Sequence, residues 1–149
     1  MELRGGIKGM AADKFVEKVT IYNDIPADAV NPRTFHRFVI DKCLTYEQIS
    51  ETNTNTIRKI INTNNVLTKD IEHYKKPRDY SLLPADLKQN FYTVQPNDFV
   101  VLSEVDDVVE NALDFQKLQK KYKNNGFLVT AVSAFLNGTK TNHIHIMHG

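Results

Sequence analysis

The chain has 149 residues, which predicts a single domain large enough to bury a core without a disulfide or a metal ion. Its 19 basic and 18 acidic side chains give a formal net charge of +1, which excludes the basic excess that electrostatic binding of nucleic acid requires. No apolar run approaches the roughly 18 residues of a membrane helix, and the first residues lack the order of a signal peptide, so we expect the chain in the cytosol where it is made.

The chain begins with a segment that predicts a flexible arm, and two strands follow it. Residues 1–14 hold three of the six glycines and show little periodicity, so this arm has no core of its own. Residues 15–22 favour a strand, with apolar and polar side chains alternating over residues 19–22. Residues 34–40 predict a second strand, which continues toward Leu44.

The middle of the chain is polar and interrupted by turn-forming residues. Residues 46–56 are rich in Thr and Asn and predict a loop or hairpin connection, followed by a strand at 56–61 and a turn at 62–65. Residues 62–90 predict a long loop, whose aromatic part at 71–87 we expect to be ordered and to contact a partner. The residues expected at a partner interface, two of them in the arm, are Ile7, Met10, Tyr74, Pro77, Arg78, Tyr80, Leu82 and Leu83.

Residues 91–135 predict a compact unit of strands around one helix. Two β-rich runs, 91–94 and 99–102, flank the turn at 95–98. The period then changes, and an apolar stripe with acidic residues early and lysines late predicts an amphipathic helix at about 104–123. The stripe consists of Val105, Val108, Val109, Ala112, Leu113, Leu118 and Tyr122.

The expected boundaries of this helix are capping residues. Ser103 with Asp106 predicts the N-terminal cap, and residues 124–126 predict the C-terminal stop because Gly tolerates a left-handed backbone. A strand is expected at 127–135, and Asn137-Gly138 predicts a hairpin into a last strand at 141–146.

These elements indicate a mainly β chain of the α+β type. We expect a small antiparallel β-barrel or sandwich of five to seven short strands, with one inserted helix at about 104–123. The expected organisation is the arm at 1–14 and a single β-barrel-like domain at 15–149.

The C-terminal histidines are the most prominent titratable cluster. On a strand, His143 and His145 point to the same side, where they could hold a metal ion, with His36 as a further candidate ligand and a small metal-dependent enzyme or metal-binding module as the implied function. The favoured alternative is that Ile144 and Ile146 face the core while the histidines face solvent or a neighbouring subunit. We therefore expect no bound metal.

Other reactive residues have structural explanations. Cys43 is expected to be a small buried apolar residue, and the acids around Asp106 and Asp107 are explained by helix capping and the helix dipole. No phosphate-binding glycine loop, nucleophile elbow or zinc-helix motif occurs, so we expect no catalytic residues, no cofactor and no enzymatic activity.

The order of short motifs along the chain resembles a family of small structural proteins of tailed phages and prophages. The resemblance extends from about Val19 to Ile146, with Asn97 where such proteins often carry Gly. The motifs are residues 19–23, 36–40, 56–58, 76–80, 91–101, 121–123 and 129–132.

This resemblance implies a head-tail connector of the head-closure, or stopper, type in the neck of the virion, made in the cytoplasm of the bacterial host. Such proteins form rings, typically of twelve copies, between the portal and adaptor on one side and the tail on the other. DNA then passes through the channel without sequence-specific binding, and no membrane is involved. A tail-terminator or tail-completion protein, usually a ring of six copies, is the alternative within the same class.

Overall fold

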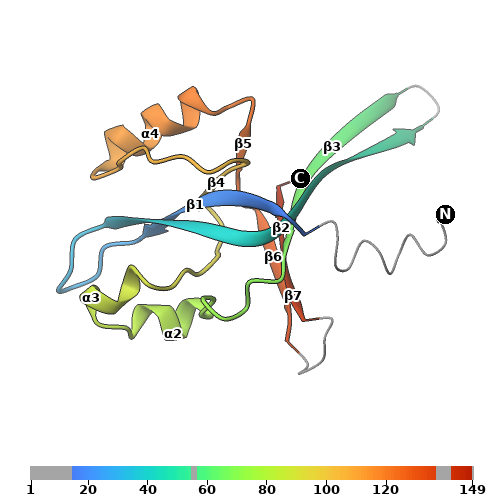
Figure 1. Cartoon of the computed structure of the whole chain (residues 1–149). Helices are drawn as coiled ribbons and strands as arrows, with labels where there is room; N and C mark the ends of the chain where they lie inside the picture. Colours follow the sequence, from blue (N-terminus) through green and yellow to red (C-terminus); the bar gives the residue numbers. More distant parts are fainter. Residues whose placement is uncertain (1–14, 55–56, 137–141, 149) are drawn as a thin grey trace.

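The computed structural model describes residues 15–54, 57–136 and 142–148, so the expected arm at 1–14 lies outside the described residues. The described chain is mainly β, which confirms the predicted fold class (Figure 1). Its strands are β1 (Glu17–Ile25), β2 (Thr34–Asn53), β3 (Arg58–Thr68), β4 (Phe99–Val101), β5 (Gly126–Leu128), β6 (Ala131–Phe135) and β7 (His143–His148). Its helices are α2 (Pro77–Ser81), α3 (Ala85–Lys88) and α4 (Ala112–Lys121).

The seven strands form one antiparallel sheet in the order β5-β4-β1-β2-β3-β7-β6, which curls into a half-barrel. Its two outermost strands are consecutive in sequence. The first half of the segment 126–135 pairs with β4, and the second half pairs with β7. At the junction, the Val129 N–H donates to the Asp98 carbonyl and the Thr130 N–H donates to the Met147 carbonyl, both at 2.8 Å. This single segment therefore joins the two edges of the sheet.

β2 is 20 residues long and changes partner along its length. Residues 34–43 pair with β1, and residues 43–53 pair with β3. The β1–β2 register shifts near Lys42, whose φ of 58° lies in the left-handed region, and such a bulge bends a strand. The bend lets the second half of β2 leave the β1 side of the sheet.

The sheet is buried on both of its faces over β1 and β4. Inner residues Val19, Ile21 and Val100 join the main core with Tyr74 and Tyr92. The outer residues of the same strands pack against α4 in a second cluster, which consists of Tyr22, Phe99, Val101, Phe115 and Leu118. Thr20 is also buried on this face. The side chains of residues 19–22 therefore point alternately to the two faces of the sheet, as predicted, but all four are buried. In Figure 1, α4 lies on one side of β1 and β2 and α2 and α3 lie on the other.

The helix predicted at about 104–123 is shorter than expected and starts at Ala112. Residues 104–110 are not helical because β1 side chains take their backbone groups: the Val105 N–H donates to Thr20 Oγ1 at 3.0 Å, and the Tyr22 hydroxyl donates to the Asp107 carbonyl at 2.8 Å. The cap is Asn111, whose Oδ1 accepts from the Asp114 N–H at 2.9 Å, so the predicted Ser103 cap is wrong.

Several other segments differ from their predictions. The loop or hairpin connection expected at 46–56 is part of β2 as far as Asn53, and its residues 55–56 lie outside the described residues. The expected turn at 62–65 lies within β3, and the expected loop at 62–90 starts only after Thr68 and contains α2 and α3. Residues 91–94 form no strand beyond an isolated bridge between Tyr92 and Tyr74. The predicted strand at 127–135 is split into β5 and β6. The antiparallel β6–β7 pairing agrees with the predicted hairpin, whose Asn137-Gly138 turn lies outside the described residues.

A buried carboxylate fixes the turn at 95–98 to β1. Asp98 is fully buried and accepts hydrogen bonds from the Asn23 side-chain amide at 2.8 Å and from the backbone N–H groups of Asp24 and Gln95, each at 2.9 Å. Asn97, in the same turn, has a φ of 80°, which explains why Asn or Gly is suited to this position. Burial raises the pKa of Asp98 to about 7, although the three N–H donors oppose this shift.

The raised pKa predicts a pH-dependent stability that Asp98→Asn removes. The folded state binds the proton of Asp98 more tightly than the unfolded state. The contribution of protonated Asp98 to the unfolding free energy is therefore greatest below pH 4 and is lost as the pH rises to 7. The unfolding free energy of the wild type minus that of Asp98→Asn should therefore fall by roughly 4 kcal/mol over this range in urea titrations. A difference that instead increases with pH would mean that the N–H donors outweigh burial.

Gly126 allows β5 to approach β4 closely. A Cβ atom at this position would lie 2.7 Å from the Val100 carbonyl oxygen and 2.9 Å from Phe99 Cζ. Glycine is therefore required by the β4–β5 contact, and the predicted reason, a left-handed helix stop, is wrong because α4 already ends at Lys121.

We predict that Gly126→Ala destabilises the fold by about 1–3 kcal/mol, because backbone atoms must shift to admit the methyl group. Urea unfolding followed by circular dichroism measures the loss. Asn124→Ala, at an exposed position in the turn just before β5, is the control and should change stability by less than about 0.5 kcal/mol. Equal effects of the two variants would contradict the steric explanation.

Candidate assembly surface

The ends of β2 and β3 form a two-stranded ribbon that extends beyond the rest of the sheet (Figure 1). β1 pairs with β2 only as far as Cys43, and β7 pairs with β3 only from Asn64 onward. Beyond these points, within the described residues, the two strands pair only with each other, from the Gln48–Thr63 pair out to the Asn53–Arg58 pair. Residues 46–53 and 58–63 are called the ribbon below.

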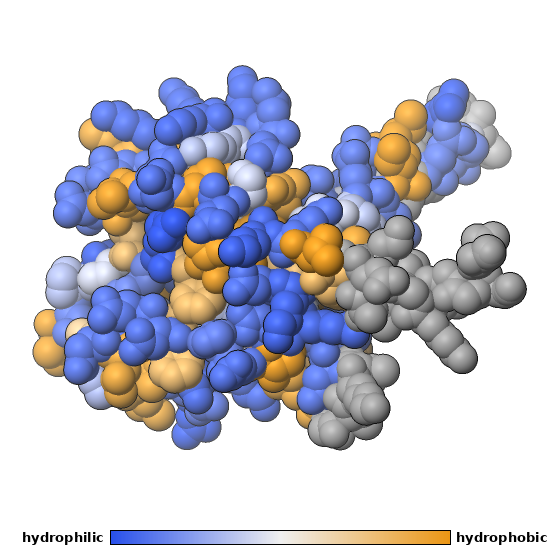
Figure 2. Space-filling model, in the orientation of Figure 1, coloured by the Kyte–Doolittle hydropathy of each residue, from blue (hydrophilic) through white to orange (hydrophobic). Residues whose placement is uncertain are grey.

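One face of the ribbon continues the inner face of the half-barrel. The inner core pair Thr45–Val66 is followed on the same face by Glu47–Asn64, Ile49–Asn62 and Glu51–Ile60, because every second cross-strand pair shares a face. Ile49 and Ile60 are 67% and 58% exposed although both are large and apolar. Figure 2 shows hydrophobic side chains along the projecting ribbon. Exposed isoleucines among polar residues on a projecting element are typical of an interaction surface.

The ribbon ends in a turn with a local ion pair. The Thr54 N–H donates to the Ile57 carbonyl at 2.7 Å, and Ile57 is 63% exposed. The Arg58 guanidinium contacts the Glu51 carboxylate through Nε at 2.6 Å and Nη2 at 2.5 Å. Because both side chains are substantially exposed, this ion pair contributes little to stability.

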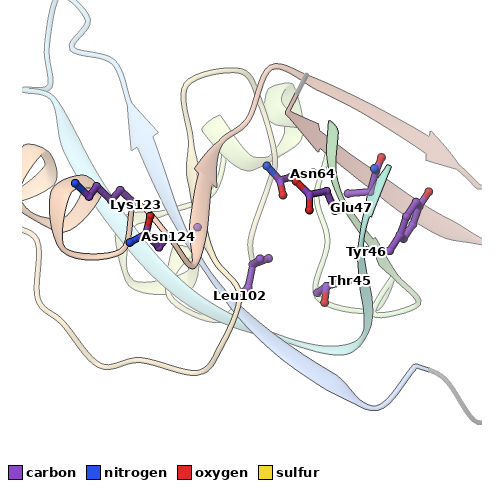
Figure 3. A pocket seen from close by; sticks show the side chains of 9 residues that line it. Thr45, Tyr46, Glu47, Asn64, Leu102, Lys123 and Asn124 are labelled. Carbon is purple, nitrogen blue, oxygen red and sulfur yellow. The ribbon is translucent and has the colours of Figure 1, made fainter. Parts of the chain in front are cut away.

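A polar pocket of about 400 Å³ opens at the base of the ribbon. Figure 3 shows Glu47 and Asn64 on one side of it and Lys123 and Asn124, from the turn after α4, on the other. Thr45 and Leu102 also line it. The amides and charges suit hydrogen bonding to a polar partner group, next to the exposed isoleucines of the ribbon.

A second cleft, of about 460 Å³, brings together three of the predicted interface residues. Pro77, Tyr80 and Leu83 line it on the α2–α3 side, opposite the β1–β2 connection with Pro26 and Pro32. Burial and Lys88, which also lines the cleft, lower the pKa of His36.

The predicted interface residues divide into core and surface. Tyr74 and Tyr80 are 9% and 1% exposed and belong to the interior of the chain, so the expectation that their rings contact a partner is wrong. Pro77, Arg78 and Leu82 are exposed, and Leu83 is half-buried. Ile7 and Met10 lie outside the described residues.

The isoleucines of the last strand face the core, as the favoured alternative predicted, and His143 and His145 on the other side are half-buried. Ile144 and Ile146 are fully buried. His143 stacks on Phe135 with ring centroids 4.7 Å apart, and His145 Nε2 lies 2.7 Å from Asn65 Oδ1. Burial, with His143 nearby, lowers the pKa of His145. Among the residues that the structure describes, no three His, Cys, Asp or Glu side chains are grouped so that they could hold a metal ion.

The remaining reactive side chains have structural contacts. Cys43 is buried, as predicted, and burial raises the pKa of its thiol to about 12. Asp107 does not cap a helix; its carboxylate accepts from Lys121 Nζ at 2.7 Å and from the Tyr122 hydroxyl at 2.6 Å, which holds its pKa below the usual range. It joins the segment before α4 to the end of that helix.

Sequence reasoning allowed a hairpin connection at 46–56 but missed the length of the two strands that form the ribbon, because Thr and Asn suggested a loop or turn. The available signal was the Thr, Ile and Tyr content of residues 45–63, since these residue types favour strands.

No helix in the described residues is long and apolar enough to cross a membrane.

Two residues of the predicted interface should differ sharply on truncation. Tyr80→Ala should cost about 3–5 kcal/mol of unfolding free energy because it empties a buried site. Leu82→Ala, two positions later at 75% exposure, should stay within about 0.5 kcal/mol. Chemical denaturation of both variants measures this. A small effect of Tyr80→Ala would contradict its place in the core.

Comparison with known proteins gives one match. A model of a family of unknown function (DUF6751) matches residues 15–148, which covers every strand of the half-barrel and the ribbon. No curated protein and no solved structure matches the chain. The chain belongs to the family of unknown function DUF6751.

Proposed function

We propose that this chain is a structural component of a tailed-phage neck, a head-tail connector ring protein of the head-closure type. The observation that carries the proposal is the ordered motif resemblance from about Val19 to Ile146. In this proposal the chain is located in the virion and links the portal and adaptor to the tail.

The architecture is consistent with such a part. Motif residues 19–23 lie in β1, residues 36–40 lie in β2, and residues 129–132 lie where the two sheet edges meet. These motifs therefore form the rigid half-barrel. The ribbon and the exposed part of α2 extend from it and are available for contacts with other proteins.

The partner contacts in this proposal are the accessible residues around α2 and the ribbon. Pro77, Arg78, Leu82 and Leu83 contact the adaptor or a tail protein, with the cleft beside α2 receiving part of that partner. With a formal net charge of +1, the ring confines DNA by size and local charge and does not bind its sequence.

Deleting the gene from the phage that encodes it tests the proposal. A head-closure role predicts separate heads and tails by electron microscopy, with heads that lose their DNA, and joining is restored by supplying the protein in trans. Tails of uncontrolled length would favour the tail-terminator alternative, and a ring of six copies in place of twelve would do the same. Normal infectious particles without the protein would refute both.

A further inference from the structure

Within the part of the chain that the structure describes, no strand pairs with either outer edge of the ribbon. Within the described residues, β2 has no partner but β3 beyond Tyr46, and β3 has no partner but β2 before Asn64. A two-stranded ribbon is only marginally stable in water, and an open edge accepts another strand through main-chain hydrogen bonds. The ribbon therefore has two positions at which a further strand can pair.

The two edges carry opposite charges. Between residues 46 and 63, the acidic residues are Glu47 and Glu51, both on β2, and the basic residues are Arg58 and Lys59, both on β3. Pairing two β2 edges or two β3 edges would bring like charges together, which is unfavourable across neighbouring strands. Pairing the β2 edge of one ribbon with the β3 edge of another brings opposite charges together.

The direction of the strands agrees with this pairing. In each ribbon β2 runs outward and β3 runs back, so two ribbons that project side by side bring β2 of one copy antiparallel to β3 of the next. Ile49 and Ile60 lie on the same face, so the exposed isoleucines of neighbouring ribbons would lie on one face of the shared sheet. The contact uses two different surfaces, and repeated contacts of this kind form a ring when the rotation closes.

We propose that the β2 edge of the ribbon binds the β3 edge of the ribbon in a second copy of this chain, so that the ribbons assemble into one continuous antiparallel sheet around the ring. This inference rests on the proposed function in that it specifies the contact that forms the ring. The exposed Glu51–Arg58 ion pair within one copy is a weak competitor, because solvent screens it.

Charge reversal tests the pairing. Glu47→Lys with Glu51→Lys makes both edges basic, and Arg58→Glu with Lys59→Glu makes both edges acidic. Each double variant alone should self-associate at least about tenfold more weakly than the wild type in sedimentation velocity and mass photometry. An equimolar mixture should recover assembly, because acidic and basic copies alternate around the ring.

The matched control for Glu47→Lys with Glu51→Lys is Asp106→Lys with Glu110→Lys, which makes the same change in net charge at exposed positions away from the ribbon. It should assemble as the wild type does, and thermal melts establish that every variant is folded. Wild-type protein that stays monomeric at all concentrations, variants that assemble normally, or a mixture that does not recover would each overturn the ribbon pairing.

The gene-deletion experiment keeps the two proposals apart. Particles that need the protein while the charge variants assemble and complement normally would leave the neck function standing and remove the ribbon contact. If virions form normally without the protein but its rings respond to charge reversal, the ribbon contact would stand and the neck function would be refuted.

Discussion

The structure depends on one constraint, which is that a single segment pairs with both edges of the sheet. Residues 126–135 hydrogen-bond β4 first and β7 afterwards, with the hydrogen bonds of Val129 and Thr130 marking the exchange. The curl of the sheet follows from this closure, and so does the concave core of Val19, Ile21, Val100 and their neighbours. Gly126 is the point at which the closing segment meets β4, where any side chain would collide with the Val100 carbonyl.

The ribbon is a consequence of strand lengths within that closed arrangement. β2 has 20 residues and β3 has 11, whereas β1 has 9 and β7 has 6. The bend at Lys42 directs the second half of β2, which has no partner residues in β1, away from β1. Interior and ribbon share one face, so the apolar pattern that fills the core at Val66 reappears at the exposed Ile49 and Ile60. Ile49 and Ile60 are apolar but stay exposed in the single chain, which is what a contact with another protein requires.

Sequence reasoning predicted the mainly β class, the strands around Val19 and Ile40, the buried Cys43 and the inward isoleucines of the last strand, because local propensity and alternation agree with the tertiary structure there. It failed where tertiary contacts override local preference. The apolar stripe from Val105 indicated a helix, but Thr20 and Tyr22 take the backbone groups of that segment. Tyr74 and Tyr80 were expected at the surface, since no period in their segment could indicate that both enter the interior.

Part of the candidate assembly surface could be predicted from the sequence. The charges of Glu47, Glu51, Arg58 and Lys59 are visible in the sequence, but their division between two edges can be recognised only when β2 and β3 are known to pair.

Electron cryo-microscopy of the native assembly is the most direct test of the ribbon pairing. We predict a closed ring in which β2 of each copy is hydrogen-bonded to β3 of the next throughout the ribbon. Ribbons separated from one another, or each paired with a different protein, would contradict it.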